Sequence, residues 1–137
     1  MLDIGEGFVF ADEQEAQAAC EWWQRELRLQ DWDIKCWIRR QHDMAPNVDG
    51  EFNLVQEHKQ GWIKLLDPVD YSPNTAWLQD HERTLVHELL HYHMTSISVE
   101  EGALQEVAKE QMIELTAGAL VNLRRLAYPG PPWRRKQ

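Results

Sequence analysis

Two histidines stand four residues apart in the segment TLVHELLHYH. His87 and His91 share one face of any α-helix formed here, because a turn of about 100° per residue places positions four apart almost in line. Imidazole nitrogens bind zinc, and a catalytic zinc ion usually takes three protein ligands. Glu88 lies about 100° around the helix from His87, where a general base for an activated water molecule would stand beside the ion. The segment therefore predicts most of a hydrolytic metal site and lacks one ligand.

A second helix is needed to supply the missing ligand. Glu110 and Glu114 are again four residues apart, and they share a helix face with Val107, Ala117 and Val121. We expect these small neighbours to let that face lie against the helix that carries the two histidines. Carboxylates on a packed, mostly apolar face need a cation or a proton, which favours a metal at this place.

The pattern HELLH resembles the HExxH signature of the zincin metallopeptidases, and the downstream EQMIE resembles the gluzincin branch of that family. The resemblance implies that His87 and His91 are zinc ligands and that Glu88 is the general base. It also implies that Glu110 is the third ligand and that Glu114 accepts a hydrogen bond that orients a ligating histidine. The reverse assignment, with Glu114 as ligand and Glu110 as its support, stays open at this point.

The rest of the chain has to position these residues. Periodicity of about 3.6 residues predicts helices, alternation predicts strands, and Asp12 and Asp80 are suitable helix caps. We expect six elements: a helix over 12–29, a strand over 31–40, two short strands within 51–68, the HExxH helix over 81–94 and a last helix over 103–126.

This layout predicts an α+β fold: a minimal zincin-like domain with an N-terminal helix, a small three-stranded sheet, the HExxH helix and a C-terminal helix. It is similar to the minimal single-domain metallopeptidases of phages and bacteria. The 137 residues suffice for one domain. We expect its core within about 12–126 and a flexible basic tail over 127–137.

The amino-acid composition limits the classes of partner that the protein is expected to bind. With 23 acidic residues against 14 Lys plus Arg, the net charge of −9 argues against nucleic-acid binding, and we expect the seven tryptophans to pack in the core and at its rim. The absence of a long apolar run predicts no membrane partner and a cytoplasmic location. Cys20 and Cys36 are expected to be buried free thiols.

The predicted function is zinc-dependent hydrolysis, with Zn²⁺ as cofactor, Glu88 as general base and a peptide or protein as substrate. The alternative is a non-catalytic, zinc-stabilised binding or regulatory module of the same fold. Tyr71, Tyr92 and His93 are candidates for stabilising an oxyanion by residue type alone. The histidines outside the motif, among them His81 and His93, are expected to be surface residues or satisfied polar groups.

Overall fold

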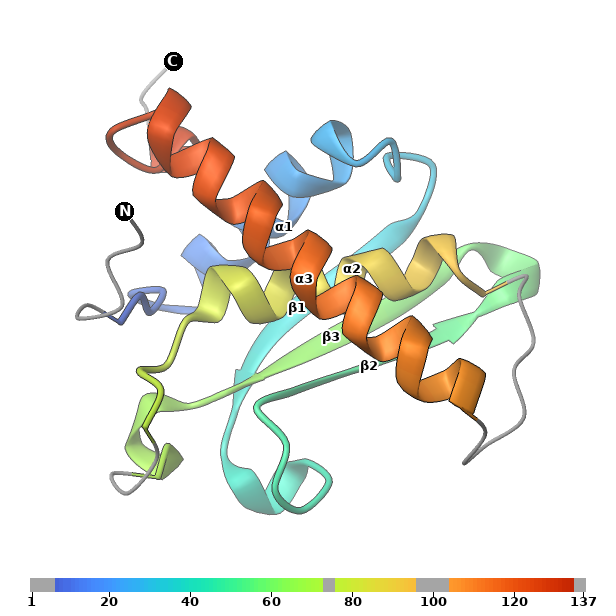
Figure 1. Ribbon diagram of the computed structural model, residues 1–137, viewed down its shortest axis with the longest axis horizontal. Coiled ribbons are helices and arrows are strands. Elements are labelled where there is room, and N and C mark those ends of the chain that lie inside the picture. The colour runs from blue at the N-terminus through green and yellow to red at the C-terminus, as the bar shows by residue number, and fades with distance from the viewer. Residues whose placement is uncertain (1–6, 73–75, 96–103, 135–137) are drawn as a thin grey trace.

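A computed structural model describes residues 7–72, 76–95 and 104–134. Three helices and a small mixed sheet of three strands build an α+β domain, in which α3 crosses in front of α2 and α2 lies in front of the sheet (Figure 1). The order of elements agrees with the sequence prediction. In chain order they are α1 (Glu13–Glu26), β1 (Asp33–Arg39), β2 (Gly50–Val55), β3 (Gln60–Leu66), α2 (His81–His93) and α3 (Leu104–Ala127).

Helix α1 begins where the sequence predicts. The Asp12 side chain accepts a hydrogen bond of 2.9 Å from the backbone N–H of Glu15, which satisfies one of the unpaired donors of the first turn. Ala16, Ala19 and Trp23 follow at helical spacing and are buried. This face fixes α1 against the sheet.

The strand order of the sheet is β1-β3-β2. β3 pairs antiparallel with β2, so the two short strands expected within 51–68 form a hairpin, and β3 also pairs parallel with β1. Ile63, at the centre of β3, lies opposite Cys36 on one side and Phe52 on the other. The alternation within β1 predicts which face is buried, but it contains nothing that specifies the neighbouring strand.

The core lies between the sheet and the helices α1 and α2. Ile34 and Cys36 of β1 and Ile63 and Leu65 of β3 point into it and are at most 2% exposed. Residues that alternate with them point to the other side, where the rings of Trp37 and Trp62 stack with centroids 6.2 Å apart. This pair is half-buried on that outer face. Trp23 and Trp32 are buried in the core, as predicted, whereas Trp77 is 69% exposed, against the prediction.

The outer edge of β1 is covered by side chains of α1. Gln17 accepts a hydrogen bond of 2.8 Å from the backbone N–H of Cys36 and donates one of 3.0 Å to the carbonyl of Ile34. Glu13 accepts another, of 3.0 Å, from the N–H of Ile38. Two helix side chains thus provide the hydrogen bonds that a further strand would otherwise make.

The segment expected to be a flexible tail, 127–137, contacts the rest of the domain in its described part. The ring of Trp133 packs edge-on against Phe8 and Phe10, and its Nε1–H donates a hydrogen bond of 3.0 Å to Glu15. Arg134 forms an ion pair with the same carboxylate. These contacts of the half-buried Trp133 ring and of Arg134 tie the segment to the N-terminal part of the domain, and residues 135–137 lie outside the described part.

Two further predictions concern the cysteines and the membrane. Cys20 and Cys36 are free and buried, as expected. Among the residues that the structure describes, none of the helices combines the length and the apolar character needed to cross a membrane.

Candidate metal centre

Helix α2 presents the two histidines of the HExxH motif on the side that faces α3. Asp80 caps its first turn by accepting a hydrogen bond of 3.0 Å from the backbone N–H of Arg83, as the sequence predicts. Leu85, Val86 and Leu89 are fully buried against the sheet. Because these three residues fix the rotation of the helix, its histidine stripe is turned toward α3.

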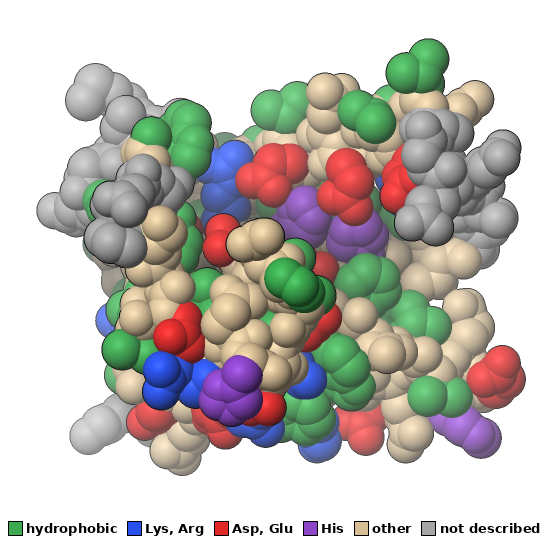
Figure 2. Space-filling view, turned by 90° about the horizontal axis from the view of Figure 1, so that it is seen from below, with side chains coloured by type: hydrophobic (Ala, Val, Ile, Leu, Met, Phe, Trp, Pro, Cys, Tyr) green, Lys and Arg blue, Asp and Glu red, His purple; other side chains and the backbone are tan. Residues whose placement is uncertain are grey.

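Both histidines of the motif contact one carboxylate of α3. The Nε2 atom of His87 lies 3.1 Å from one oxygen of Glu110, and the Nε2 atom of His91 lies 2.9 Å from the other. The histidine side chains are 17% and 11% exposed, and that of Glu110 is 46% exposed. In the space-filling view, two histidine side chains lie side by side among acidic ones (Figure 2). The structure therefore brings together the three residues predicted as metal ligands.

Glu114 contacts the opposite nitrogen of the first histidine. Its Oε2 atom lies 2.8 Å from Nδ1 of His87, and its Oε1 atom accepts a hydrogen bond of 3.0 Å from Nε of Arg83. A histidine that donates from Nδ1 to a carboxylate has its Nε2 lone pair directed at a metal. The contacts thus favour Glu110 over Glu114 as the carboxylate that would bind a metal together with the two histidines.

Arg83 is a site residue that the sequence analysis missed. It stands four residues before His87 and so belongs to the same helix stripe, which is the signal that would have identified it. Its guanidinium fits over Gly118 of α3, where an added Cβ atom would lie only 3.1 Å from Nη2. A residue without a side chain at this point lets the arginine reach Glu114.

Phe52 is a second residue that sequence reasoning missed. Its ring stacks on the imidazole of His91, with centroids 4.8 Å apart and planes 17° apart. Burial lowers the pKa of His91, although the neighbouring Glu110 acts in the opposite direction. Stacking on Phe52 therefore fixes the plane of the His91 imidazole. Burial favours the neutral form of this imidazole, which is the form that binds a metal.

Glu88 lies on the inner side of the histidine pair. It is 7% exposed, and among the described residues one of its oxygens and one nitrogen from each of His87 and His91 lie within 4.8 Å of one another. Burial raises the pKa of Glu88 to about 8, and the negative charges of Glu110, Glu51 and Glu114 add to the effect. A buried carboxyl group near three acids holds its proton at neutral pH unless a cation is present.

β2 approaches the motif helix closely beside Glu88. A Cβ atom added to Gly50 would lie 2.4 Å from Cγ2 of Thr84 and 3.5 Å from an oxygen of Glu88. The lack of a side chain at Gly50 lets the edge strand of the sheet come this close. Burial also raises the pKa of the adjacent Asp49, with a contribution from Glu114, so the surroundings of the histidine pair are strongly acidic.

The donor set fits a zinc ion. Two ligands that each bind at about 2.1 Å in a tetrahedral arrangement lie about 3.4 Å apart. The two contacts between the histidines and Glu110, 2.9 and 3.1 Å, are only a few tenths of an ångström shorter than this separation. Because Glu110 is half-exposed, an outward movement of its carboxylate would make room for the ion.

One neighbour of the predicted ligands differs from expectation. Val107 was expected on the packed face of α3 with Ala117 and Val121, but it is 51% exposed, whereas the other two are buried. Packing of α3 against α2 therefore begins after this residue. Glu110 and Glu114 lie at the rim of the contact between α3 and α2. Their side chains are 46% and 49% exposed, more than expected for residues on a packed, mostly apolar face.

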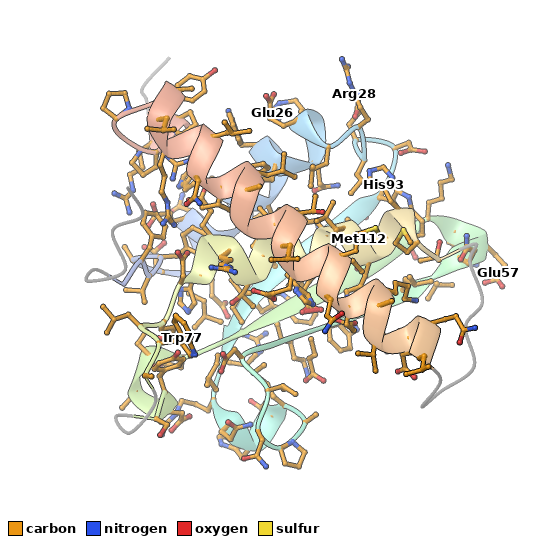
Figure 3. All side chains as sticks on the ribbon, in the orientation of Figure 1. Glu26, Arg28, Glu57, Trp77, His93 and Met112 are labelled. Carbon is orange, nitrogen blue, oxygen red and sulfur yellow. The ribbon has the colours of Figure 1, made fainter. Side chains whose placement is uncertain are left out.

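The other candidates by residue type are used elsewhere. The hydroxyl of Tyr92 donates to the carbonyl of Asn53 at 2.8 Å, and that of Tyr71 donates to the carbonyl of Trp77 at 2.7 Å. The Nε2 atom of His93 lies 2.6 Å from the carbonyl of Leu27, on the side of α2 toward the end of α1 (Figure 3). Through these hydrogen bonds the three side chains support the fold around the histidine pair.

His81 confirms the expectation of a satisfied polar residue. It is 1% exposed, its Nδ1 atom accepts a hydrogen bond of 3.0 Å from the N–H of Phe10, and its Nε2 atom lies 2.8 Å from the carbonyl of Leu66. Burial lowers its pKa. This histidine ties the N-terminal segment to the end of β3.

No protein family matches the chain, and neither a curated protein nor a solved structure is significantly similar to it.

Proposed function

We propose that this protein is a zinc-dependent metallohydrolase of zincin-like fold and that it cleaves peptide bonds. The observation that carries the proposal is the contact of both motif histidines with the single carboxylate of Glu110, at 3.1 and 2.9 Å. Two imidazoles and one carboxylate are a ligand set of catalytic zinc sites, which keep one position for water or substrate. His87, His91 and Glu110 would hold the ion.

The residues around this set are suited to hydrolysis. When bound, zinc supplies Lewis-acid chemistry, polarising a carbonyl group and acidifying a water molecule. Glu88 would serve as general base toward a water molecule beside the histidine pair and as general acid toward the departing amine, a task for which a carboxyl group with a pKa near neutrality is suited. Glu114, itself held by Arg83, orients the ring of His87.

A peptide is the proposed substrate because of the position of β2. This strand forms one edge of the sheet, and it packs against α2 next to Glu88. Extended peptides bind at sheet edges by adding backbone hydrogen bonds to the outer strand. A peptide held along β2 would pass close to the histidine pair.

One observation favours a second candidate, a zinc site that only stabilises the fold. An oxygen of Glu88 is near enough to His87 and His91 to join the same ion. If Glu88 binds the metal together with Glu110, four protein groups close the coordination sphere, as in structural zinc sites. The protein would then be a zinc-stabilised binding or regulatory module without hydrolytic activity.

The first experiment measures the zinc content of the purified protein by mass spectrometry after incubation with zinc and removal of the excess. We expect about one ion per chain in the wild type and loss of the ion in His87→Ala and Glu110→Ala. His93→Ala is the matched control, because this histidine belongs to the same helix and contacts Leu27 instead. Wild-type protein that stays free of zinc would refute both candidates.

A second measurement separates the two candidates. We expect the zinc-loaded wild type to cleave members of a peptide library, and Glu88→Gln to keep its zinc and lose the cleavage. Loss of zinc from Glu88→Gln, together with no cleavage by the wild type, would establish the structural site. Full cleavage by zinc-loaded Glu88→Gln would refute the assigned role of Glu88.

A further inference from the structure

Helix α3 carries an apolar stripe on the side turned away from α2. Leu104, Leu115 and Leu126 are 85%, 71% and 82% exposed. Figure 1 shows this helix as the outermost element in front of α2, and Figure 3 labels Met112, another member of the stripe. All members are exposed; they are Leu104, Ala108, Met112, Leu115, Ala119, Leu123 and Leu126.

The spacing of the stripe is regular along the whole helix. Its members follow one another at intervals of four, four, three, four, four and three residues, so that Leu104, Leu115 and Leu126 are each eleven apart. An eleven-residue repeat corresponds to about 3.67 residues per turn, close to the period of a straight helix. The stripe therefore stays on one side over the helix length of about 36 Å.

Charged residues are missing from this side of α3. At about 100° per residue, every charged residue of the helix lies about 90° or more from the centre of the stripe. The positions that flank the stripe are the uncharged Gln105, Gln111, Thr116 and Asn122. A helix face that meets only water normally carries charges. The charged residues, on the other sides of the helix, are Glu106, Lys109, Glu110, Glu114, Arg124 and Arg125.

We propose that this stripe is the interface of a homodimer in which the α3 helices of two copies pack antiparallel about a twofold axis at Leu115. The sizes of the side chains in the stripe indicate that the partner is a second copy of the chain. Counted from Leu115, Ala108 lies seven residues before and Leu123 eight after, while Met112 lies three before and Ala119 four after. Antiparallel pairing therefore places each alanine opposite a large side chain of the other copy.

The ends of the stripe match in the same way. Leu104 and Leu126 lie eleven residues before and after the centre, so each faces the other across the axis. A parallel pair would instead set alanine against alanine and leave gaps, which a packed interface excludes. A surface that complements itself under a twofold rotation is the property of an isologous dimer interface.

The absence of charge on the stripe makes it the surface at which a second copy is least repelled. The chain has a net charge of −9, so two copies repel each other at most surfaces. The stripe and its flanks contribute no charge to that repulsion. Because one helix pair about 36 Å long is a small interface, we expect a reversible dimer in the micromolar range. The proposal of a dimer does not depend on the proposed zinc chemistry.

Sedimentation velocity over about 1–500 µM protein tests the dimer, a span that covers micromolar association. We expect a shift from monomer to dimer in the wild type. Leu115→Glu, which brings two carboxylates together at the axis, should stay monomeric over the whole range. Val69→Glu is the matched control, because Val69 is 68% exposed outside α3, and it should dimerise like the wild type.

Two outcomes of the sedimentation experiment would overturn the proposal. One is a wild type that stays monomeric at every concentration, and the other is a Leu115→Glu variant that dimerises normally. The far-ultraviolet circular dichroism of Leu115→Glu verifies that it is folded. Should it be unfolded, Leu123→Gln replaces it, and retained dimerisation of that variant would likewise count against the interface.

Cross-linking tests the direction of the helices. An equal mixture of Ala108→Cys and Leu123→Cys proteins should form mixed disulfide dimers on mild oxidation, because antiparallel pairing sets these positions opposite each other. Each variant alone should give little cross-linked product. Efficient cross-linking of each variant with itself, without the mixed product, would refute the antiparallel arrangement.

Discussion

Replacing Glu88 with glutamine should remove a pH dependence from the stability of the metal-free protein. The carboxyl group has an ordinary pKa of 4.5, which burial and three neighbouring acids raise to about 8 in the folded chain. Between these values the folded chain holds a proton that the unfolded chain has released. The free energy of unfolding therefore falls as the pH rises across this window.

The size of the effect follows from the same two values. At about 1.4 kcal/mol for each pH unit, the difference between 8 and 4.5 amounts to about 5 kcal/mol over the whole window. Between pH 5 and pH 8 we expect the metal-free wild type to lose about 4 kcal/mol through this group. Glu88→Gln has no proton to release, so it should lack this loss.

Urea unfolding at pH 5, 6.5 and 8 in the presence of a chelator measures the effect as the difference between wild type and variant. Other titrating groups affect both proteins equally and cancel in that difference. Glu57→Gln is the control, because Glu57 is exposed within the turn that connects β2 and β3 (Figure 3). Equal pH dependence of wild type and Glu88→Gln would show that Glu88 is not a buried, protonated acid.

Three further predictions follow from the site and its support. Glu114→Gln should weaken zinc binding about 10–100-fold, measured by competition with a chelator, because His87 loses its charged hydrogen-bond partner. Glu82→Gln should lower the free energy of unfolding in urea by about 3–5 kcal/mol, because Glu82 is fully buried and paired with the buried Arg124. Burial lowers the pKa of His81 from 6.5, so the unfolded chain takes up this proton first as the pH falls. Stability should therefore decrease below about pH 6.5, and His81→Gln should reduce that decrease in urea unfolding at pH 7 and pH 5.

Most elements and the ligand candidates could be predicted from local sequence signals. Asp12 and Asp80 are helix caps that act on the next turn, and the buried face of β1 follows from simple alternation. His87 and His91 share a stripe whatever surrounds the helix. Such predictions succeed because each depends on residues only a few positions apart.

The parts that escaped prediction depend on contacts between distant segments. The parallel pairing of β1 with β3 depends on how the connecting segments and helices pack. The alternation of residues within a strand contains no information about which strand becomes its neighbour. Phe52 reaches His91 from another strand. Trp133 packs on residues at the opposite end of the chain, more than a hundred positions away. The basic, proline-rich composition of this segment gives no sign of these long-range contacts.

The side chains of α1 along β1 affect how the protein behaves in concentrated solution. An open strand edge can pair with the edge of another molecule, and this pairing begins many β-aggregates. Gln17 and Glu13 occupy the hydrogen-bonding groups of β1 that such a strand would need. Addition of a strand from another molecule is thereby hindered at β1, which leaves β2 as the edge of the sheet where such pairing would meet fewer obstacles.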